Sequence, residues 1–344
     1  MRKVAVVTTG FFDGVHLGHR HVLETVVSLA RERAEEAVVV TFWPHPRTVL
    51  QQDARDFRLL TGLEEKKELL TSCGIDRVEV LPFTREFAAM KADEYLRLLR
   101  DRYNASTVVM GYDNRIGSDR KTAKDLAGEQ CLPPIVAARP LPCAALSERL
   151  LWAPPGNPGD MTDPPCNPPR GISALTGRAE GGHGLAEDTA LQPDDCHTER
   201  SESISSTKIR QALEEGRVEE ANGMLGYKYG LYGVVVAGNR MGRTIGFPTA
   251  NMQLYEPLKL VPMNGVYAVE VEVLGGLYKG MCNIGLRPTV DGKVRTIETH
   301  ILDFNQDIYG LPVRLHFVRR IRDERKFPSL EALREQIVID CQGI

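Results

Sequence analysis

The sequence predicts an α/β domain with a doubly wound parallel sheet, followed by an antiparallel β-barrel. Strand and helix patterns alternate over residues 1–130, which is typical of a parallel sheet covered by helices on both faces. Many short β-rich segments separated by turns follow from residue 232 onward, which is typical of a barrel. The chain of 344 residues is long enough for two such domains with well-formed cores.

Short β-branched runs and apolar residues at helical spacing assign the elements of the first domain. The expected strands are Val4–Val7, Val38–Phe42, Val78–Leu81 and Thr107–Met110, and the expected helices are His21–Arg33, Leu63–Ser72 and Ala92–Tyr103. Ligands of such sheets bind beyond the carboxyl ends of the strands. The loop after the first strand is therefore a candidate for a binding site.

The elements of the second domain are mostly strands with alternating or β-rich patterns. These expected strands are Tyr232–Ala237, Gly265–Leu274, Leu277–Ile284, Thr296–Leu302 and Val313–Val318. A helix is expected before them at Ser205–Glu215. Another is expected after them at Ser329–Asp340, with Ser329 as its N-cap.

The loop between the first strand and the first helix has the composition of a phosphate-binding site. His16 and His19 lie where the helix is expected to start, and unpaired N–H groups with a partial positive charge attract anions there. Gly10, Gly14 and Gly18 let the backbone approach a phosphate closely. Two imidazoles at this point can donate hydrogen bonds to phosphate oxygens. Taken alone, the residues also fit a surface turn, or a zinc site without its other ligands.

Residues 131–202 differ in kind from both domains. They hold 12 of the 21 prolines and four of the seven cysteines, and they show neither the helical nor the strand period. Such a segment cannot bury enough apolar surface to offset the entropy of ordering it, so we expect most of it to be disordered. A structureless segment of this length within a domain is abnormal. We interpret it as an insert of foreign or frame-shifted sequence.

The composition excludes several classes of protein. A formal net charge of −3 gives no global field that would attract nucleic acid or membranes. No stretch approaches the roughly 18 apolar residues of a membrane span, and the N-terminus runs into a strand pattern without a signal-peptide core. Seven cysteines without a C-x-x-C pair argue against a disulfide scaffold or zinc ribbon. We therefore expect a cytoplasmic protein that binds neither nucleic acid nor membranes. The sequence does not indicate whether the protein is a monomer or an oligomer.

The run from Gly10 to His19, Gly-Phe-Phe-Asp-Gly-Val-His-Leu-Gly-His, closely resembles the nucleotide-binding signature of the bacterial bifunctional riboflavin kinase/FAD synthetase family. The resemblance implies that the first domain is a Rossmann-like nucleotidylyltransferase, which transfers AMP from ATP to FMN. It implies catalytic roles for His16 and His19. The ATP-contacting residues that it implies are Gly10, Phe12, Asp13, Gly14 and Gly18.

Two further segments fit the flavin side of this domain. The run Thr-Phe-Trp-Pro-His-Pro at the end of the second strand is similar to a family segment that lines the flavin and nucleotide pocket. Phe42 or Trp43 would stack on an aromatic ligand, and His45 would donate to a phosphate. The alternative is an ordinary strand exit stiffened by two prolines. Gly111–Gly117 resembles a family motif in which Asp113 is kept as a flavin-binding residue, although two of its aromatic positions differ.

The run Ser-Ser-Thr-Lys-Ile-Arg is similar to a second phosphate clamp of the family. It places Ser205, Ser206 and Thr207 on ATP and gives Arg210 a catalytic role, in which it shares the charge of the phosphates with the histidines and Mg²⁺. A routine helix N-cap is the alternative. Because residues 131–202 separate the two clamps in sequence, we expect the clamps to be out of register and adenylylation to be impaired. An ordered strand immediately before Ser203 would contradict that expectation.

The segment Gly233–Asn251 is the most specific string of the chain, and it resembles the riboflavin kinase signature almost throughout. Its glycines are expected to form a flap whose backbone folds over phosphates. Thr249 and Asn251 offer hard oxygen ligands for an Mg²⁺ ion shared with ATP. A glycine-rich hairpin is the alternative for such a loop alone. The implied ATP-contacting residues of the flap are Gly238, Gly242, Arg243 and Gly246.

A carboxylate on the fourth barrel strand completes the kinase prediction. We expect Glu298 to point into the mouth of the barrel and to act as a general base. By the resemblance, it deprotonates the ribityl 5′-hydroxyl of riboflavin as that hydroxyl attacks the γ-phosphorus of ATP. A solvated strand carboxylate is the alternative. Arg287 and Phe327 lie in family segments near the flavin, whereas His300 fits a structural role equally well.

The predictions combine into a two-domain enzyme of riboflavin kinase and FMN adenylyltransferase activity. Residues 1–130, completed by 203–220, form the adenylyltransferase, residues 131–202 the insert and residues 221–344 the riboflavin kinase-like barrel. Riboflavin, FMN and ATP are the substrates, with Mg²⁺ as cofactor. Alternatives are a kinase whose first domain is a relic, and a non-catalytic flavin-binding regulator. A tRNA-charging enzyme is disfavoured because the barrel lacks a basic or aromatic nucleic-acid face.

Overall fold

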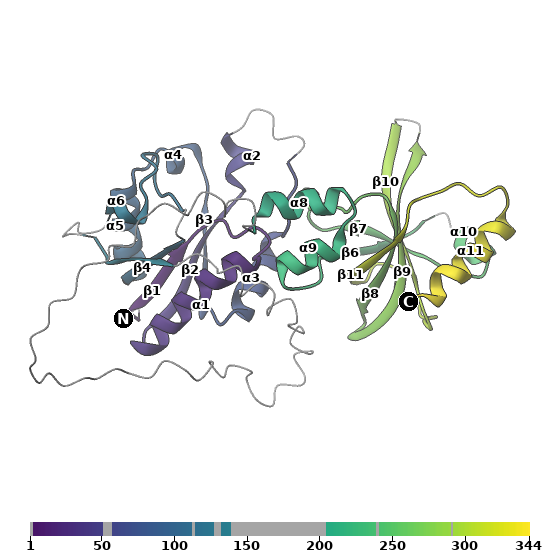
Figure 1. Ribbon diagram of the computed structural model, residues 1–344, viewed down its shortest axis with the longest axis horizontal. Coiled ribbons are helices and arrows are strands. Elements are labelled where there is room, and N and C mark those ends of the chain that lie inside the picture. Colours follow the sequence, from purple (N-terminus) through teal and green to yellow (C-terminus); the bar gives the residue numbers. More distant parts are fainter. Residues whose placement is uncertain are drawn as a thin grey trace, which may run out of the picture. The chain divides into compact units, whose positions relative to one another are not determined.

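A computed structural model gives the structure of the chain (Figure 1). It describes residues 3–50, 57–111, 114–126, 132–138, 204–238, 241–289 and 292–344. Most of the predicted insert, from residue 139 onward, therefore lies outside the described residues, as do Asp113 and the position immediately before Ser203. The side chains of Arg243 and Arg287 also lie outside them.

The first part of the chain forms a five-stranded, fully parallel sheet of order β3-β2-β1-β4-β5. Its strands are β1 (Ala5–Thr9), β2 (Glu36–Trp43), β3 (Arg77–Pro82), β4 (Ala105–Gly111) and β5 (Ile135–Ala138). The four predicted strands are confirmed. No strand was predicted within residues 131–202, but β5 lies there and pairs with β4 from Val108↔Ile135 onward. This strand was not predicted because it has only four residues and directly follows two prolines, which are typical of loops.

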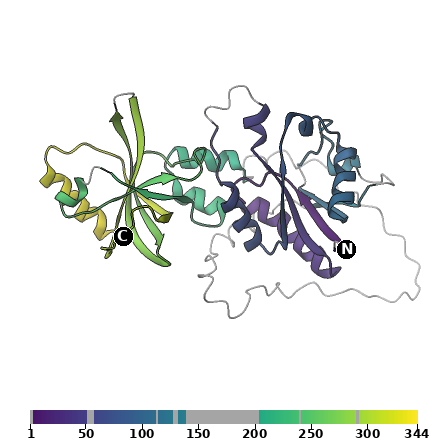
Figure 2. The ribbon, with the colours of Figure 1, turned by 180° about the vertical axis from the view of Figure 1, so that it is seen from behind.

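Helices cover both faces of this sheet (Figure 2). They are α1 (Leu17–Glu32), α2 (Pro46–Leu50), α3 (Leu63–Ser72), α4 (Arg85–Ala88), α5 (Ala92–Tyr103) and α6 (Ala123–Leu126). Successive residues of a strand point to opposite faces. Accordingly, Val6 packs in one core with Leu23 of α1, and Val7 packs in another with Leu96 of α5. The predicted doubly wound arrangement is confirmed.

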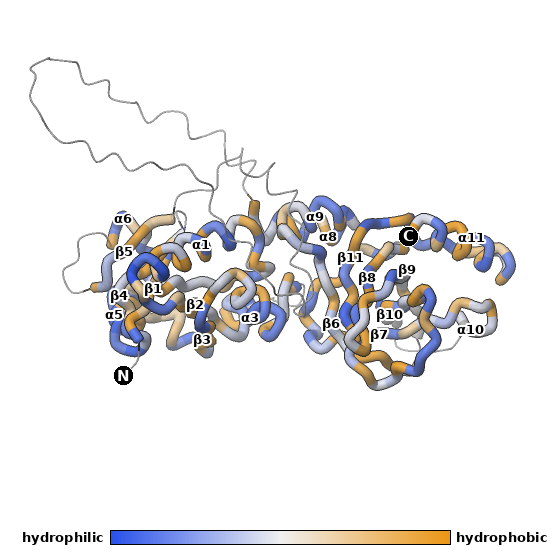
Figure 3. The backbone as a smooth tube through the Cα atoms, turned by 90° about the horizontal axis from the view of Figure 1, so that it is seen from below, coloured by the Kyte–Doolittle hydropathy of each residue, from blue (hydrophilic) through white to orange (hydrophobic). Residues whose placement is uncertain are grey.

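The last part of the chain is a closed antiparallel barrel of order β10-β7-β6-β11-β8-β9. The strands are β6 (Gly230–Val236), β7 (Ala250–Leu254), β8 (Gly265–Val273), β9 (Gly276–Thr289), β10 (Gly292–Ile301) and β11 (Pro312–Arg322). Hydrophobic and hydrophilic stretches alternate along them, because only one face is buried (Figure 3). Five strands were predicted; β7 was missed because polar residues occupy its alternate positions.

The helices described in the last part of the chain are α8 (Ser206–Glu214), α9 (Val218–Leu225), the short α10 (Met241–Thr244) and α11 (Leu330–Gln342). Ser329 caps α11 through its hydroxyl, as predicted, and Ser205 caps α8 in the same way, which was the alternative to its predicted ATP contact. The sequence prediction missed α9, although Val218, Ala221 and Leu225 have helical spacing and are fully buried in the barrel core. The placement of 203–220 in the first domain stays a prediction.

Candidate functional site

The two histidines of the first loop lie one above the other at the start of α1. His16 is the N-cap, and its Nδ1 accepts a hydrogen bond of 3.3 Å from the backbone N–H of His19. The two rings stack with their centroids 3.6 Å apart. Since Nδ1 of His16 is an acceptor, the hydrogen of its neutral ring lies on Nε2. The helix begins four residues earlier than predicted, because this cap brings His19 into its first turn.

Burial keeps both imidazoles uncharged. It lowers the pKa of His16 to about 4. Burial, and then the charges of His16 and Lys66, hold the pKa of His19 well below its ordinary value. Neutral imidazoles at a helix N-terminus donate hydrogen bonds to an anion without carrying a positive charge themselves.

We expect acid to destabilise this fold through His16. The unfolded chain takes up a proton near pH 6.5, whereas the folded protein takes it up only near pH 4. The stabilising contribution is thus fully present above pH 6.5 and is lost as the pH falls towards 4, by on the order of 3 kcal/mol. Urea denaturation of the wild type and of His16→Gln at several pH values measures it. Equal slopes of unfolding free energy against pH for both proteins would contradict the expectation.

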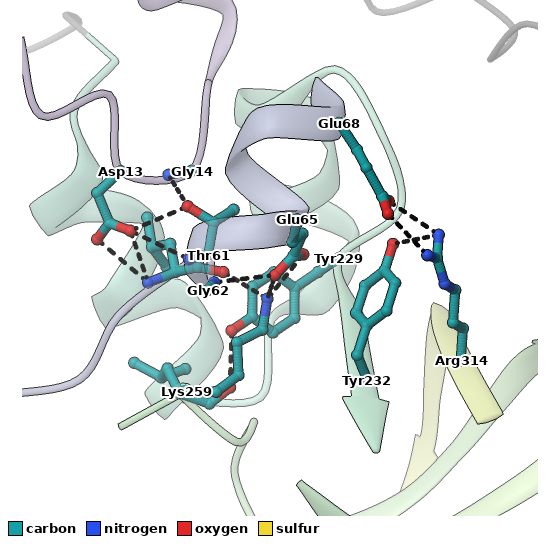
Figure 4. A network of polar contacts seen from close by, with 12 residues as sticks. Asp13, Gly14, Thr61, Gly62, Glu65, Glu68, Tyr229, Tyr232, Lys259 and Arg314 are labelled. Atoms are coloured by element: carbon teal, nitrogen blue, oxygen red, sulfur yellow. Dashed lines mark hydrogen bonds and ion pairs between the residues drawn. The ribbon is translucent and has the colours of Figure 1, made fainter. Parts of the chain in front are cut away.

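Asp13 joins the histidine loop to two distant segments, and Figure 4 shows its contacts with the one that contains Thr61. Its buried carboxylate accepts hydrogen bonds from the backbone N–H groups of Leu60 and Thr61, both at 3.0 Å, and from the Thr61 hydroxyl at 3.2 Å. It also forms an ion pair with Arg210 of α8. The sequence predicted an ATP contact for Asp13, whereas the structure places its carboxylate oxygens on protein donors.

The second phosphate clamp is bonded directly to the first. The Ser206 hydroxyl donates to the backbone oxygen of Asp13 at 3.0 Å, and the guanidinium of Arg210 donates through Nε to the Arg58 oxygen at 2.8 Å. Ser205 is occupied as the N-cap, and Thr207 is exposed. These contacts hold the two clamps together, which contradicts the prediction that residues 131–202 leave them out of register. The residues immediately before Ser203, where an ordered strand would have contradicted the expectation, lie outside the described residues.

Steric limits explain two of the loop glycines. Gly14 adopts φ +83°, and a Cβ there would lie 2.9 Å from the Leu60 side chain. A Cβ at Gly18 would lie 3.2 Å from the His16 ring. A side chain would therefore strain the backbone at Gly14 and would push the His16 ring from its position at Gly18. The Phe12 ring, which was predicted to contact ATP, is buried in the core beneath α1, and a Cβ at Gly10 would meet it at 3.1 Å.

The end of β2 contributes aromatic and imidazole rings. His45 lies against Phe11, with ring centroids 3.8 Å apart, and burial lowers its pKa to about 3. Phe42 packs against Phe87 in the sheet core, while Trp43 is half-buried. The structure therefore brings His45 to the histidine loop through Phe11, and it places Phe42 among core side chains.

The sequence analysis missed Lys66 of α3, whose side chain is fully buried beside this loop. Its Nζ lies 3.6 Å from the centre of the Phe11 ring. A signal was present in the sequence, because Lys66 precedes the buried Leu70 by four residues and so lies on the same face of the helix. A lysine on the apolar face of an amphipathic helix is unusual and points to a local function.

Glu298 of β10 lies in a row of polar residues across three strands. It is directly opposite Asn251 of β7 and Asn283 of β9, so the three side chains share one face of the barrel. Their neighbours Ile297 and Thr299 are buried on the other face. The prediction that Glu298 points into the barrel mouth is therefore wrong: strand alternation turns it to the outer face.

The glycine-rich segment lies beside this row. A Cβ at Gly238 would come within 2.1 Å of the Asn251 side chain, and a Cβ at Gly242 within 2.2 Å of the Phe247 oxygen. Gly246 adopts φ +86° with open space around it. Thr249 is half-buried, and His300 bonds the preceding Pro248 oxygen at 2.8 Å, which is the structural role left open for it. The ring of Phe327 lies under Arg325, at 4.8 Å.

Comparison with known proteins covers both parts of the chain. The model of the family described as FAD synthetase matches residues 1–133, and the model described as riboflavin kinase matches residues 225–344. A protein of Bacillus subtilis named bifunctional riboflavin kinase/FMN adenylyltransferase is 35% identical, over 98% of this chain and 90% of the relative. The protein of the same name from Escherichia coli is 34% identical, over 97% and 90%.

A solved structure also matches the whole chain. It is titled macrolide-efflux protein from Streptococcus pneumoniae and is 31% identical, with a TM-score of 0.75 over 98% of this chain and 93% of that one. None of the helices in the described ranges has the length and apolarity needed to cross a membrane.

Proposed function

The chain belongs to the bifunctional riboflavin kinase/FMN adenylyltransferase family, and we propose that it phosphorylates riboflavin to FMN and adenylylates FMN to FAD, with ATP in both reactions. The observation that carries this conclusion is the match of two enzyme families to separate segments of one chain. One segment contains the parallel sheet with its histidine loop, and the other contains the closed barrel.

For adenylyl transfer, we assign the phosphates of ATP to the start of α1. An oxygen of the FMN phosphate attacks the α-phosphorus, the bond to the bridging oxygen breaks, and pyrophosphate leaves. The attacking phosphate is already ionised, so no general base is needed. His16, and His19 with it, donate from neutral rings to the phosphate oxygens, while Arg210 spreads the developing charge. Two groups of the Arg210 guanidinium bond Asp13 and the Arg58 oxygen, and its other N–H groups suit a phosphate.

The remaining residues of the adenylylation site are assigned by position. Gly10, Gly14 and Gly18 allow the backbone to approach the triphosphate, and Thr207 is the exposed hydroxyl of the second clamp. Asp13 and Ser206 hold the two clamps together. We place the flavin near Trp43 and His45, at the end of β2.

For riboflavin phosphorylation, we assign the reacting groups to the outer face of the barrel. A carboxylate oxygen of Glu298 takes the proton of the 5′-hydroxyl, whose oxygen attacks the γ-phosphorus as ADP leaves. The segment around Gly238, Gly242 and Gly246 supplies backbone N–H groups to the phosphates. We assign Phe327 and Arg287 to the flavin side.

Thr249 and Asn251 are suited to hold Mg²⁺. The described residues contain no cluster of three histidine, cysteine, aspartate or glutamate side chains able to bind a metal. Mg²⁺ fits this setting because it takes few protein oxygens and fills its other positions with phosphates and water. When bound, the ion neutralises charge on the transferring phosphate. We also propose a cytoplasmic location, where ATP is plentiful.

Chromatography of reaction products tests both activities. Incubation of the purified chain with riboflavin, ATP and Mg²⁺ is expected to give FMN and then FAD, and FMN with ATP is expected to give FAD directly. FMN as the end product of both incubations would support the alternative of a kinase with an inactive first domain. Tight flavin binding without either product would support the regulator and contradict the proposal.

A further inference from the structure

Two buried lysines on and near α3, Lys259 and Lys66, differ in their hydrogen-bond partners. Lys259 is buried, but its Nζ bonds both carboxylate oxygens of Glu65, at 2.8 and 2.6 Å, and the Leu60 oxygen at 2.6 Å (Figure 4). Lys66 is fully buried, and within the described ranges its Nζ has no hydrogen-bond acceptor. Glu65, its neighbour on the helix, is already engaged by Lys259. An ammonium group out of water is costly unless it is paired.

Aromatic rings take the place of a partner for Lys66. Its Nζ lies 3.6 Å from the centre of the Phe11 ring and 5.7 Å from that of Trp43. The face of an aromatic ring attracts a cation, but it stabilises the charge less than an anion does. Phe11 is also the ring against which His45 packs. Lys66 therefore lies at the point where the histidine loop and the end of β2 meet.

The charges around Lys66 leave this point positive. Burial lowers its pKa to about 8, so most of the population is protonated at pH 7. Its charge in turn lowers the pKa of both His19 and His45. Among the described residues, Asp13 is the carboxylate that raises the pKa of Lys66, and its oxygens already bond Leu60, Thr61 and Arg210. One carboxylate thus faces two cations, Lys66 and Arg210.

We propose that the ammonium group of Lys66 binds a phosphate oxygen of a substrate in the adenylylation site, that of the ATP triphosphate and then of the pyrophosphate product. The inference rests on the proposed adenylyl transfer. A phosphate there supplies the missing anion, next to the helix N-terminus and the neutral histidines. Without it, the Phe11 ring holds the cation in place. FMN also carries a phosphate, so the test separates the two sources.

The test compares Lys66→Met and Lys66→Arg with the wild type in the full chain. Lys67→Met is the matched control, because Lys67 is only half-buried and its Nζ pairs with Glu64 at the surface. Three quantities are measured: the KM for ATP and for FMN in FAD formation, inhibition of that reaction by pyrophosphate, and calorimetric binding of inorganic pyrophosphate. Riboflavin phosphorylation on the same samples reports whether the chain remains folded and active.

For Lys66→Met we expect the KM for ATP and the inhibition constant of pyrophosphate to rise by about tenfold to a hundredfold, the range for one charge-assisted hydrogen bond. Lys66→Arg should lie between, and Lys67→Met should match the wild type. The melting temperature of Lys66→Met should stay equal or rise, because an unpaired buried charge is removed. A rise in the KM for FMN alone would reassign the ligand and overturn the ATP contact.

Unchanged constants with a lowered melting temperature would show a structural cation and overturn the inference. A wild type that forms no FAD from FMN and ATP would contradict the proposed function instead. In that case calorimetry still tests whether Lys66 binds phosphate. The kinase site is identical in the wild type and in Lys66→Met, so any difference between them in pyrophosphate affinity arises at Lys66. Equal calorimetric affinities of wild type and Lys66→Met would then overturn the inference as well.

Discussion

Replacing Glu298 by Gln is expected to lower the rate of riboflavin phosphorylation by roughly 10²–10⁴-fold, the usual contribution of a general base. Glutamine has the same shape but cannot take the proton of the 5′-hydroxyl. FAD formation from supplied FMN should be unchanged, because we assign that reaction to the start of α1. The two rates are measured separately, with riboflavin and with FMN as the starting flavin.

Glu272→Gln serves as the matched control for this change. Glu272 lies on β8 of the same barrel, where it contacts His316 at 3.7 Å at the surface. Its substitution should leave both rates near those of the wild type. A Glu298→Gln variant that retains a kinase rate within a few-fold of the wild type would remove Glu298 from the catalytic assignment.

Replacing Asp13 by Ala is expected to destabilise the fold by about 3–5 kcal/mol, as found for a buried ion pair that loses one partner. The Arg210 guanidinium would keep a buried charge, and the backbone N–H groups of Leu60 and Thr61 would lose their acceptor. FAD formation should fall with it, because Asp13 holds α8 against the histidine loop. Urea denaturation and the rate of FAD formation measure the two effects.

A surface pair provides the comparison for Asp13. Asp101 pairs with Arg100 where both side chains are exposed, so Asp101→Ala should leave the free energy of unfolding near that of the wild type. The double variant Asp13→Ala/Arg210→Met should be less destabilised than the sum of its single variants, since both members of the pair are removed. Strict additivity of the two would show that the contact between Asp13 and Arg210 contributes little to stability.

The loop Leu59–Gly62 connects the histidine loop with a segment of the C-terminal part. The Leu59 N–H donates to the Leu258 oxygen, and the Leu260 N–H donates to the Leu59 oxygen, both at 2.8 Å. Nearby, Arg314 of β11 pairs with Glu68 of α3 at 2.9 Å (Figure 4). Asp13, Lys259 and Arg314 thus bond three neighbouring parts of one stretch, residues 59–68. That stretch also carries Lys66. Its many contacts fix the backbone on which the fully buried Lys66 side chain is placed.

Local patterns in the sequence determined most of the elements and the two clamps. The helices α3 and α5 begin and end at the predicted residues, and Ser329 caps α11 as predicted. These features depend on contacts within three or four residues or on the period of apolar positions, both of which a sequence displays directly. The phosphate motifs are local in the same sense.

Only the tertiary structure decided the features that depend on distant partners or on burial. The ion pair between Asp13 and Arg210 spans 197 positions, so no local pattern indicates that the Asp13 carboxylate is occupied. The low pKa of His16 and the unpaired ammonium of Lys66 arise from loss of water, which requires every neighbour to be in place. Glu298 shows the same limit: strand alternation turns it away from Ile297 and Thr299, but only closure of the barrel decides that its face is the outer one.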